Sequence, residues 1–120
     1  MMSLVKIFNV FNSAKYLERS HDGNGELLKV RPFSLNDFKT PIEFIDYVII
    51  SPNMTIGNHT HRNNEEIYFI VKGNGTMTTN SETFKVTAGD VIVNSFGDSH
   101  GLVNDSNNNI EVFIFQVNSH

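Results

Sequence analysis

The sequence predicts an all-β sandwich or barrel that forms a single domain. From residue 26 onward, short runs rich in β-branched and aromatic residues alternate with clusters of Gly, Asn, Asp, Ser and Thr, the pattern of strands joined by turns. The connections between these runs are short, so we expect successive strands to pair antiparallel. A length of 120 residues is typical of one domain with one hydrophobic core. We expect no helix after residue 20.

Turn-forming residues bound each expected strand. They cluster at 73–75, 80–81, 88–90 and 105–109, where Gly and Asn tolerate a positive φ. The expected strands are 26–33, 43–51, 58–61, 66–71, 75–79, 82–86, 90–93, 101–104 and 110–117.

Two of these strands are apolar on both faces, over 67–71 and 112–115. Such strands lie between two layers or against a partner subunit. Together with the apolar residues near the amino terminus, they predict a homodimer, formed by sheet packing or by exchange of the first strands.

The first 25 residues form a separate amino-terminal arm ahead of the barrel domain of residues 26–120. Leu4, Ile7, Phe8 and Phe11 have the spacing of one helix face, but the asparagines between them are poor in a helix interior. A short amphipathic helix and an irregular arm both stay open.

Composition excludes several classes of function. Nine Lys and Arg against thirteen Asp and Glu give a net charge of −4, which disfavours nucleic acid and anionic membranes as partners. No stretch resembles a signal peptide or is long enough to span a bilayer. The chain has no cysteine, which excludes thiolate chemistry and agrees with a cytoplasmic location.

His59 and His61 lie two positions apart in an expected strand, so both imidazoles point to the same face. The next strand starts at Glu66, which shares a face with Tyr68. If these two strands form a hairpin, Glu66 approaches the two histidines. His100 then has to come from a more distant strand, as a barrel allows. Three imidazoles and one carboxylate indicate a site for a divalent metal ion.

The spacing of these residues resembles the two motifs of the cupin superfamily. The first reads Asn53-x5-His59-x-His61-x4-Glu66-x6-Gly73, and the second reads Gly89-x5-Ser95-x-Gly97-x2-His100-x3-Asn104. The resemblance spans residues 53–104 and implies a jelly-roll barrel, the double-stranded β-helix. It also implies that His59, His61, Glu66 and His100 are the metal ligands.

Two positions depart from the cupin pattern without removing a ligand. Asn53 stands where the first motif has glycine, and Asn replaces Gly well in a left-handed turn. Ser95 stands where the second motif has proline, so the loop before His100 loses a rigid φ.

Glu65 competes with Glu66 for the fourth ligand position. The six-residue step to Gly73 and the alternation with Tyr68 favour Glu66, which leaves Glu65 as a solvated turn residue. His21 and His120 lie outside both motifs and are expected not to bind metal.

Aromatic residues supply candidates for a ligand-binding pocket: Tyr68, Phe113 and Phe115. Aromatic residues in alternating strands also serve as ordinary core, and that alternative stays open.

The ligand set predicts one divalent transition-metal ion, which could be Mn, Fe, Ni, Co, Cu or Zn, because nitrogen and oxygen ligands do not separate them. Four protein ligands leave one or two positions for water, substrate or dioxygen. We expect a metal-dependent enzyme that acts on a small polar metabolite, such as a carboxylate, keto acid or sugar, by isomerisation, decarboxylation or oxygenation.

No motif fixes an acid or base for such an enzyme, and Glu65, Tyr68 and His21 are the nearby candidates. The alternative function is a non-catalytic module that binds a carbohydrate or a carboxylate. The cupin fold hosts both enzymes and binding modules.

Overall fold

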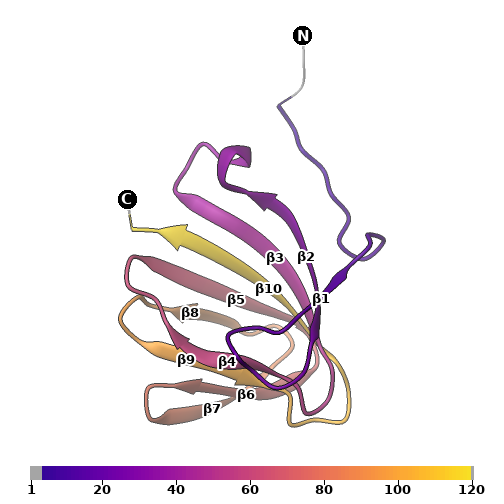
Figure 1. Cartoon of the computed structure of the whole chain (residues 1–120), viewed down its shortest axis with the longest axis vertical. Helices are drawn as coiled ribbons and strands as arrows, with labels where there is room; N and C mark the ends of the chain where they lie inside the picture. Colours follow the sequence, from indigo (N-terminus) through magenta and orange to yellow (C-terminus); the bar gives the residue numbers. More distant parts are fainter. Residues whose placement is uncertain (1–3, 120) are drawn as a thin grey trace.

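The computed structural model describes residues 4–119, which fold into two antiparallel β-sheets packed face to face (Figure 1). The described elements are β1 (Tyr16–Glu18), β2 (Leu27–Ser34), the short 3-10 helix η1 (Leu35–Asp37), β3 (Ile42–Ile50), β4 (Thr55–Thr60), β5 (Asn64–Lys72), β6 (Asn74–Thr79), β7 (Glu82–Thr87), β8 (Val91–Asn94), β9 (Ser99–Val103) and β10 (Ile110–Asn118).

The strand order identifies a jelly roll. One sheet has the order β1-β2-β3-β10-β5-β8 and the other has the order β4-β9-β6-β7. The all-β class and the double-stranded β-helix expected from the sequence are therefore confirmed, and the expected strands match β2 to β10 within a few residues. No helix among the described residues is long and apolar enough to cross a membrane.

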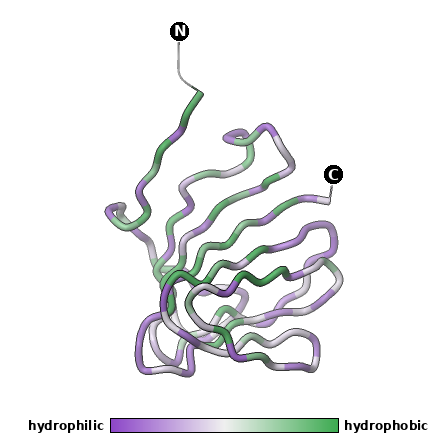
Figure 2. Tube along the Cα trace, turned by 180° about the vertical axis from the view of Figure 1, so that it is seen from behind, coloured by the Kyte–Doolittle hydropathy of each residue, from purple (hydrophilic) through white to green (hydrophobic). Residues whose placement is uncertain are grey.

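The core lies between the two sheets, where alternate residues of each strand meet. Twelve buried side chains form one cluster: Leu27, Val48, Ile50, Ile56, Tyr68, Ile70, Met77, Val86, Leu102, Ile110, Val112 and Ile114. Figure 2 shows hydrophobic residues along the strands and hydrophilic ones in many of the loops. Burial of a side chain of this size contributes roughly 1.5–3 kcal/mol to folding.

The amino-terminal arm contains no helix in residues 4–15, and its backbone runs as an irregular segment along the outer face of the larger sheet. Figures 1 and 2 show its amino-terminal end leading away from the strands. Only Val10 of this stretch is buried, where it packs with Val30 and Tyr47 on the outer face of the larger sheet. The asparagines explain the missing helix, since the Asn9 side chain accepts from the backbone of Phe11 and forms a local turn.

Two local features differ from the sequence analysis. The strand β1 was not foreseen in the amino-terminal arm, and the expectation of no helix after residue 20 was wrong, because the short helix η1 follows it. The helix forms because the Asp37 carboxylate accepts a 2.9 Å hydrogen bond from the Ser34 backbone N–H, which caps its first turn.

The hairpin considered for the strands of His61 and Glu66 does not form. β4 pairs with β9, whereas β5 pairs with β10 and β8, so the two strands lie in different sheets. Their side chains meet across the interior because the short turn between them carries the chain from one sheet to the other.

Asparagines close the loops near the end of β3. Asn53 adopts a left-handed φ of 68°, as expected for a residue in a glycine position. Asn104 is fully buried, and its side-chain amide donates to the carbonyls of Ile50 (2.8 Å) and Asn108 (2.7 Å). These bonds satisfy polar groups that burial would otherwise make costly.

Candidate metal centre

Three strands bring the four expected ligands together. His59 lies on β4, and its register partner on β9 is His100. His61 follows β4 directly, and Glu66 points inward from β5 in the opposite sheet. Neighbouring strand pairing therefore places His100 beside His59, although His100 lies 41 positions further along the sequence.

The four side chains converge on one point. The Glu66 Oε1 lies 3.3 Å from His59 Nε2, 3.0 Å from His61 Nε2 and 2.8 Å from His100 Nε2. One donor atom from each residue falls within 4.8 Å of all the others. Ligands about 2.0–2.2 Å from a first-row metal ion lie roughly 3 Å from each other, so this spacing fits such an ion.

Hydrogen bonding orients one of the imidazoles for metal binding. The Nδ1–H of His59 donates to the Gly57 carbonyl at 2.7 Å, which leaves its Nε2 lone pair directed at the cluster. The Nδ1 of His100 is buried and has no hydrogen-bond partner among residues 4–119, as also holds for Asn94 Nδ2 nearby.

Electrostatics keep the ligands in the protonation states that a metal ion requires. Burial alone would raise the pKa of Glu66, but its contacts with the three histidines outweigh burial and hold that pKa well below its usual range. Burial lowers the pKa of His100 despite the opposing effect of Glu66. At neutral pH the site thus offers a carboxylate and a neutral buried imidazole.

The structure distinguishes Glu66 from Glu65. Glu66 is buried and faces the histidines on the same face of β5 as Tyr68, whereas Glu65 is half-buried and is not part of the cluster.

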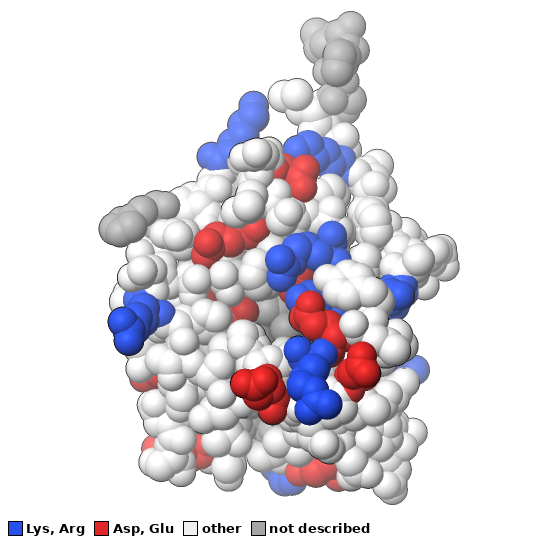
Figure 3. Space-filling model, viewed as in Figure 1, with Lys and Arg blue, Asp and Glu red and all other residues white. Residues whose placement is uncertain are grey.

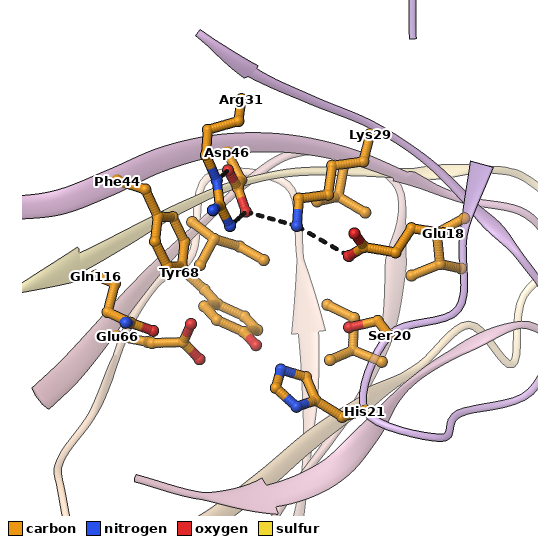
Figure 4. A pocket seen from close by; sticks show the side chains of 14 residues that line it. Glu18, Ser20, His21, Lys29, Arg31, Phe44, Asp46, Glu66, Tyr68 and Gln116 are labelled. Atoms are coloured by element: carbon orange, nitrogen blue, oxygen red, sulfur yellow. Dashed lines mark hydrogen bonds and ion pairs between the residues drawn. The ribbon is translucent and has the colours of Figure 1, made fainter. Parts of the chain in front are cut away.

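A cavity of about 300 Å³ opens beside Glu66. Its apolar wall includes Leu27, Val48, Ile56 and Ile114, and the Tyr68 ring lies next to the Glu66 carboxylate (Figure 4). Burial, then the charges of Glu66 and Asp46, raises the pKa of Tyr68 well above its ordinary value. Its hydroxyl stays protonated and can donate a hydrogen bond into the cavity.

A chain of ion pairs forms the opposite wall of the cavity (Figure 4). The Arg31 guanidinium donates two bonds to Asp46, at 2.7 and 3.0 Å. Lys29 Nζ lies 3.1 Å from Asp46 and 2.9 Å from Glu18. In Figure 3, charged side chains of both signs gather beside a hollow in the middle of this face.

These charged residues were missed in the sequence. The available signal was Asp46, a buried carboxylate inside the largely apolar strand β3. An isolated charge in a buried strand requires a partner, and the alternate positions Lys29 and Arg31 on β2 supply two.

The aromatic candidates separate into two groups. Tyr68 lines the cavity next to Glu66, whereas Phe113 and Phe115 lie on the outer face of the larger sheet, in a separate depression with Phe8 and Phe11. Strand parity explains the difference, because Phe113 and Phe115 alternate with the inward-facing Ile114.

His21 lies at the cluster, although it falls outside both motifs. Its ring stacks on His59 with centroids 3.4 Å apart and lines the cavity. It is not one of the four clustered ligands. Partial burial, followed by His59, lowers the pKa of His21 to about 4, so the ring is neutral near pH 7. His120 lies outside the described residues.

Comparison with known sequences agrees with the fold. The family model of the cupin domain matches residues 46–115. An oxalate-binding protein of Thermotoga maritima is 28% identical over 89 residues, which cover 74% of each chain.

Solved structures show the same architecture. A predicted oxalate decarboxylase from Thermotoga maritima superimposes with a TM-score of 0.90 at 22% identity, covering 94% of this chain and 99% of the other. A cupin 2 conserved barrel domain protein from Salinispora arenicola gives a TM-score of 0.73 at 18% identity, covering 99% and 91%.

Proposed function

Because this chain belongs to the family of cupin domains, we propose that it binds one divalent transition-metal ion through His59, His61, Glu66 and His100. The convergence of these four donor atoms beside a cavity carries the proposal. Nitrogen and oxygen ligands suit Mn, Fe, Ni, Co, Cu and Zn alike.

We propose a small carboxylate, of the class of oxalate, as the ligand of the cavity. The cavity wall holds three carboxylates, those of Glu18, Asp46 and Glu66, against the two cations Lys29 and Arg31. A divalent ion changes this local balance from one net negative charge to one net positive charge. The loaded cavity therefore attracts anions, and the relative named as an oxalate-binding protein supports the same class.

The chemistry that the ion supplies is Lewis-acid polarisation of a bound oxygen atom. The residues of the chain provide the surroundings for this chemistry. The Tyr68 hydroxyl donates a hydrogen bond, the apolar wall excludes water, and Lys29 faces the negative charge of the ligand. We propose a small metalloenzyme that decarboxylates, isomerises or oxygenates its substrate.

Binding without turnover is the second candidate function. It is favoured by the ion pairing of Lys29, Arg31 and Asp46, which leaves the charged wall without a free acid or base. The test is to incubate metal-loaded protein with oxalate, measuring heat of binding and the formation of formate or carbon dioxide. Saturable binding without product supports the module, and formation of product supports the enzyme. The absence of both binding and product contradicts the carboxylate proposal.

We propose that the partner of this chain is a second copy. The outer face of the larger sheet exposes Phe69, Val91 and Val93, at 39%, 65% and 59%. Phe69 and Val91 are register partners, so these side chains form a continuous apolar patch. Light scattering at micromolar concentration should give the mass of a dimer, and a monomeric mass contradicts the proposal. The cytoplasmic location stays a prediction.

A further inference from the structure

The turn that carries His21 has an unusual backbone. His21 and Asp22 both have positive φ, of 50° and 56°. Side chains other than that of glycine rarely adopt this conformation, and two in succession persist only where the surroundings impose them.

Hydrogen bonds and close packing fix this turn to the start of β4. The Gly57 N–H donates to the Ser20 carbonyl at 2.9 Å, and the Thr55 N–H donates to the Asn24 carbonyl at 3.0 Å. A Cβ atom on Gly57 would lie 1.9 Å from the His21 carbonyl oxygen, so only glycine allows this approach. The turn is therefore held by its main chain, without help from the His21 ring.

The His21 ring points into the cavity (Figure 4). It lies parallel to the His59 ring, with an interplanar angle of 7°, and its centroid is 6.2 Å from that of His61. His21 is exposed as a whole residue, and neither of its ring nitrogens has a protein hydrogen-bond partner among residues 4–119, although the ring stands beside the cluster of ligands.

A purely structural role does not account for this placement. The Gly57 carbonyl already fixes the His59 ring through Nδ1, so stacking is not needed to orient that ligand. A phenyl ring would stack equally well, and would not leave a polar nitrogen facing the cavity.

We propose that His21 is a ligand-positioning residue, whose ring nitrogen hydrogen-bonds an anion bound at the open position of the metal centre. The amino-terminal turn thus completes the site, although it lies outside residues 46–115 that match the family model. The inference rests on the proposed metal site and deepens it.

The test compares the wild-type protein with His21→Phe and His21→Asn, all loaded with Co²⁺. Phenylalanine keeps the stacking and removes the nitrogens, while asparagine tolerates the left-handed backbone and removes the ring. Asp22→Asn is the matched control, because it changes the same turn without touching the cavity. The measurements are metal content and the dissociation constants of oxalate, by calorimetry, and of azide, by visible absorption.

Both His21 variants should keep wild-type metal content and bind the anions roughly 10- to 100-fold more weakly, as expected for loss of a hydrogen bond to a charged group. The Asp22→Asn protein should bind as the wild type does. Unchanged oxalate and azide affinity in His21→Phe overturns the inference.

The azide measurement separates this inference from the proposed ligand class. If wild-type protein binds azide but not oxalate, the carboxylate proposal fails, and weaker azide binding by His21→Phe still supports the role of His21. If the wild type binds no metal ion, both proposals are overturned.

Discussion

The two polar clusters at the cavity are of opposite kinds. On one side, here called the ligand wall, three imidazoles surround the Glu66 carboxylate, which alone of these four lines the cavity, and this arrangement accepts a cation. On the other, Lys29 and Arg31 neutralise Asp46 and Glu18, an arrangement that is already paired within the protein. The donor atoms of the ligand wall are arranged to bind a metal ion, whereas the charges of the second wall are already paired with each other.

The difference distinguishes the proposed metal site from the proposed anion site. A metal ion demands fixed donor types at fixed distances, so the ligand wall follows one pattern of residues. A paired charge wall is less constrained, since many combinations of charges give the same net effect. Under the proposed function, the ligand wall would hold the metal ion and the charged wall would face the bound anion.

The largest expected effect comes from removing a ligand. His61→Ala should reduce bound metal to less than about a tenth of the wild-type content, because the remaining three ligands hold an ion far less tightly. Elemental analysis after dialysis provides the measurement. A metal content equal to that of the wild type contradicts the metal site.

The corresponding change in the charged wall should affect stability and leave metal binding intact. Asp46→Asn leaves two cations without their shared carboxylate, whose side chain is only 4% exposed. We expect the free energy of unfolding to fall by about 2–3 kcal/mol, less than for a fully buried pair because the Arg31 side chain reaches solvent.

Urea denaturation measures this loss, and Asp105→Asn is the matched control. Asp105 pairs with Lys85 on the surface, so its loss should cost less than about 1 kcal/mol. Equal losses in the two variants would contradict a special role for the Asp46 network, and loss of metal in Asp46→Asn would contradict the independence of the two walls.

A smaller effect is expected from Lys29→Met, which keeps the side-chain stem and removes the charge. The dissociation constant for oxalate should rise about tenfold, the usual effect of losing one charged contact, with metal content unchanged. Lys85→Met removes a surface lysine and should leave affinity unchanged. Calorimetry measures the oxalate affinity of both variants. If Lys29→Met binds oxalate as tightly as Lys85→Met does, Lys29 does not contact the ligand.

The smallest effect should appear in the pH dependence of the metal-free protein. The pKa of His100 is lowered on folding, so the unfolded chain takes up a proton first as the pH falls below 6.5. The lowered pKa of Glu66 acts in the same direction below its ordinary value of 4.5. Stability should therefore decrease steadily from pH 7 to pH 4.

The midpoints of urea denaturation, measured between pH 7 and pH 4, test whether stability falls on acidification. Bound metal should weaken the dependence between pH 7 and pH 6, because a coordinated imidazole is not free to titrate. A midpoint that rises on acidification would contradict the assigned pKa shifts.

The fold and the clustering of His59, His61, Glu66 and His100 were predictable, since both follow repeating rules. Alternation along β5 selected Glu66 over Glu65, and turn residues marked the strand ends. The strand pairing was not predictable at this detail, because β4 and β5 are separated by a turn that could equally have formed a hairpin. Register between distant strands depends on packing that no local pattern encodes.

The charged wall and the placement of His21 against His59 were not predicted, for a different reason. Lys29 and Asp46 lie on different strands, and their significance appears only when β2 and β3 pair. His21 reaches the centre through a backbone conformation that its residue type rarely adopts.

The distribution of the four ligands between the sheets has a mechanical consequence. His59 and His100 lie in the smaller sheet, and Glu66 lies in the larger one. An ion bound by all of them would link the two sheets, so the sheets could separate only after the ion dissociates. Hydrogen exchange should then slow in both sheets at once on metal binding, since any opening that parts the layers would be linked to dissociation of the ion.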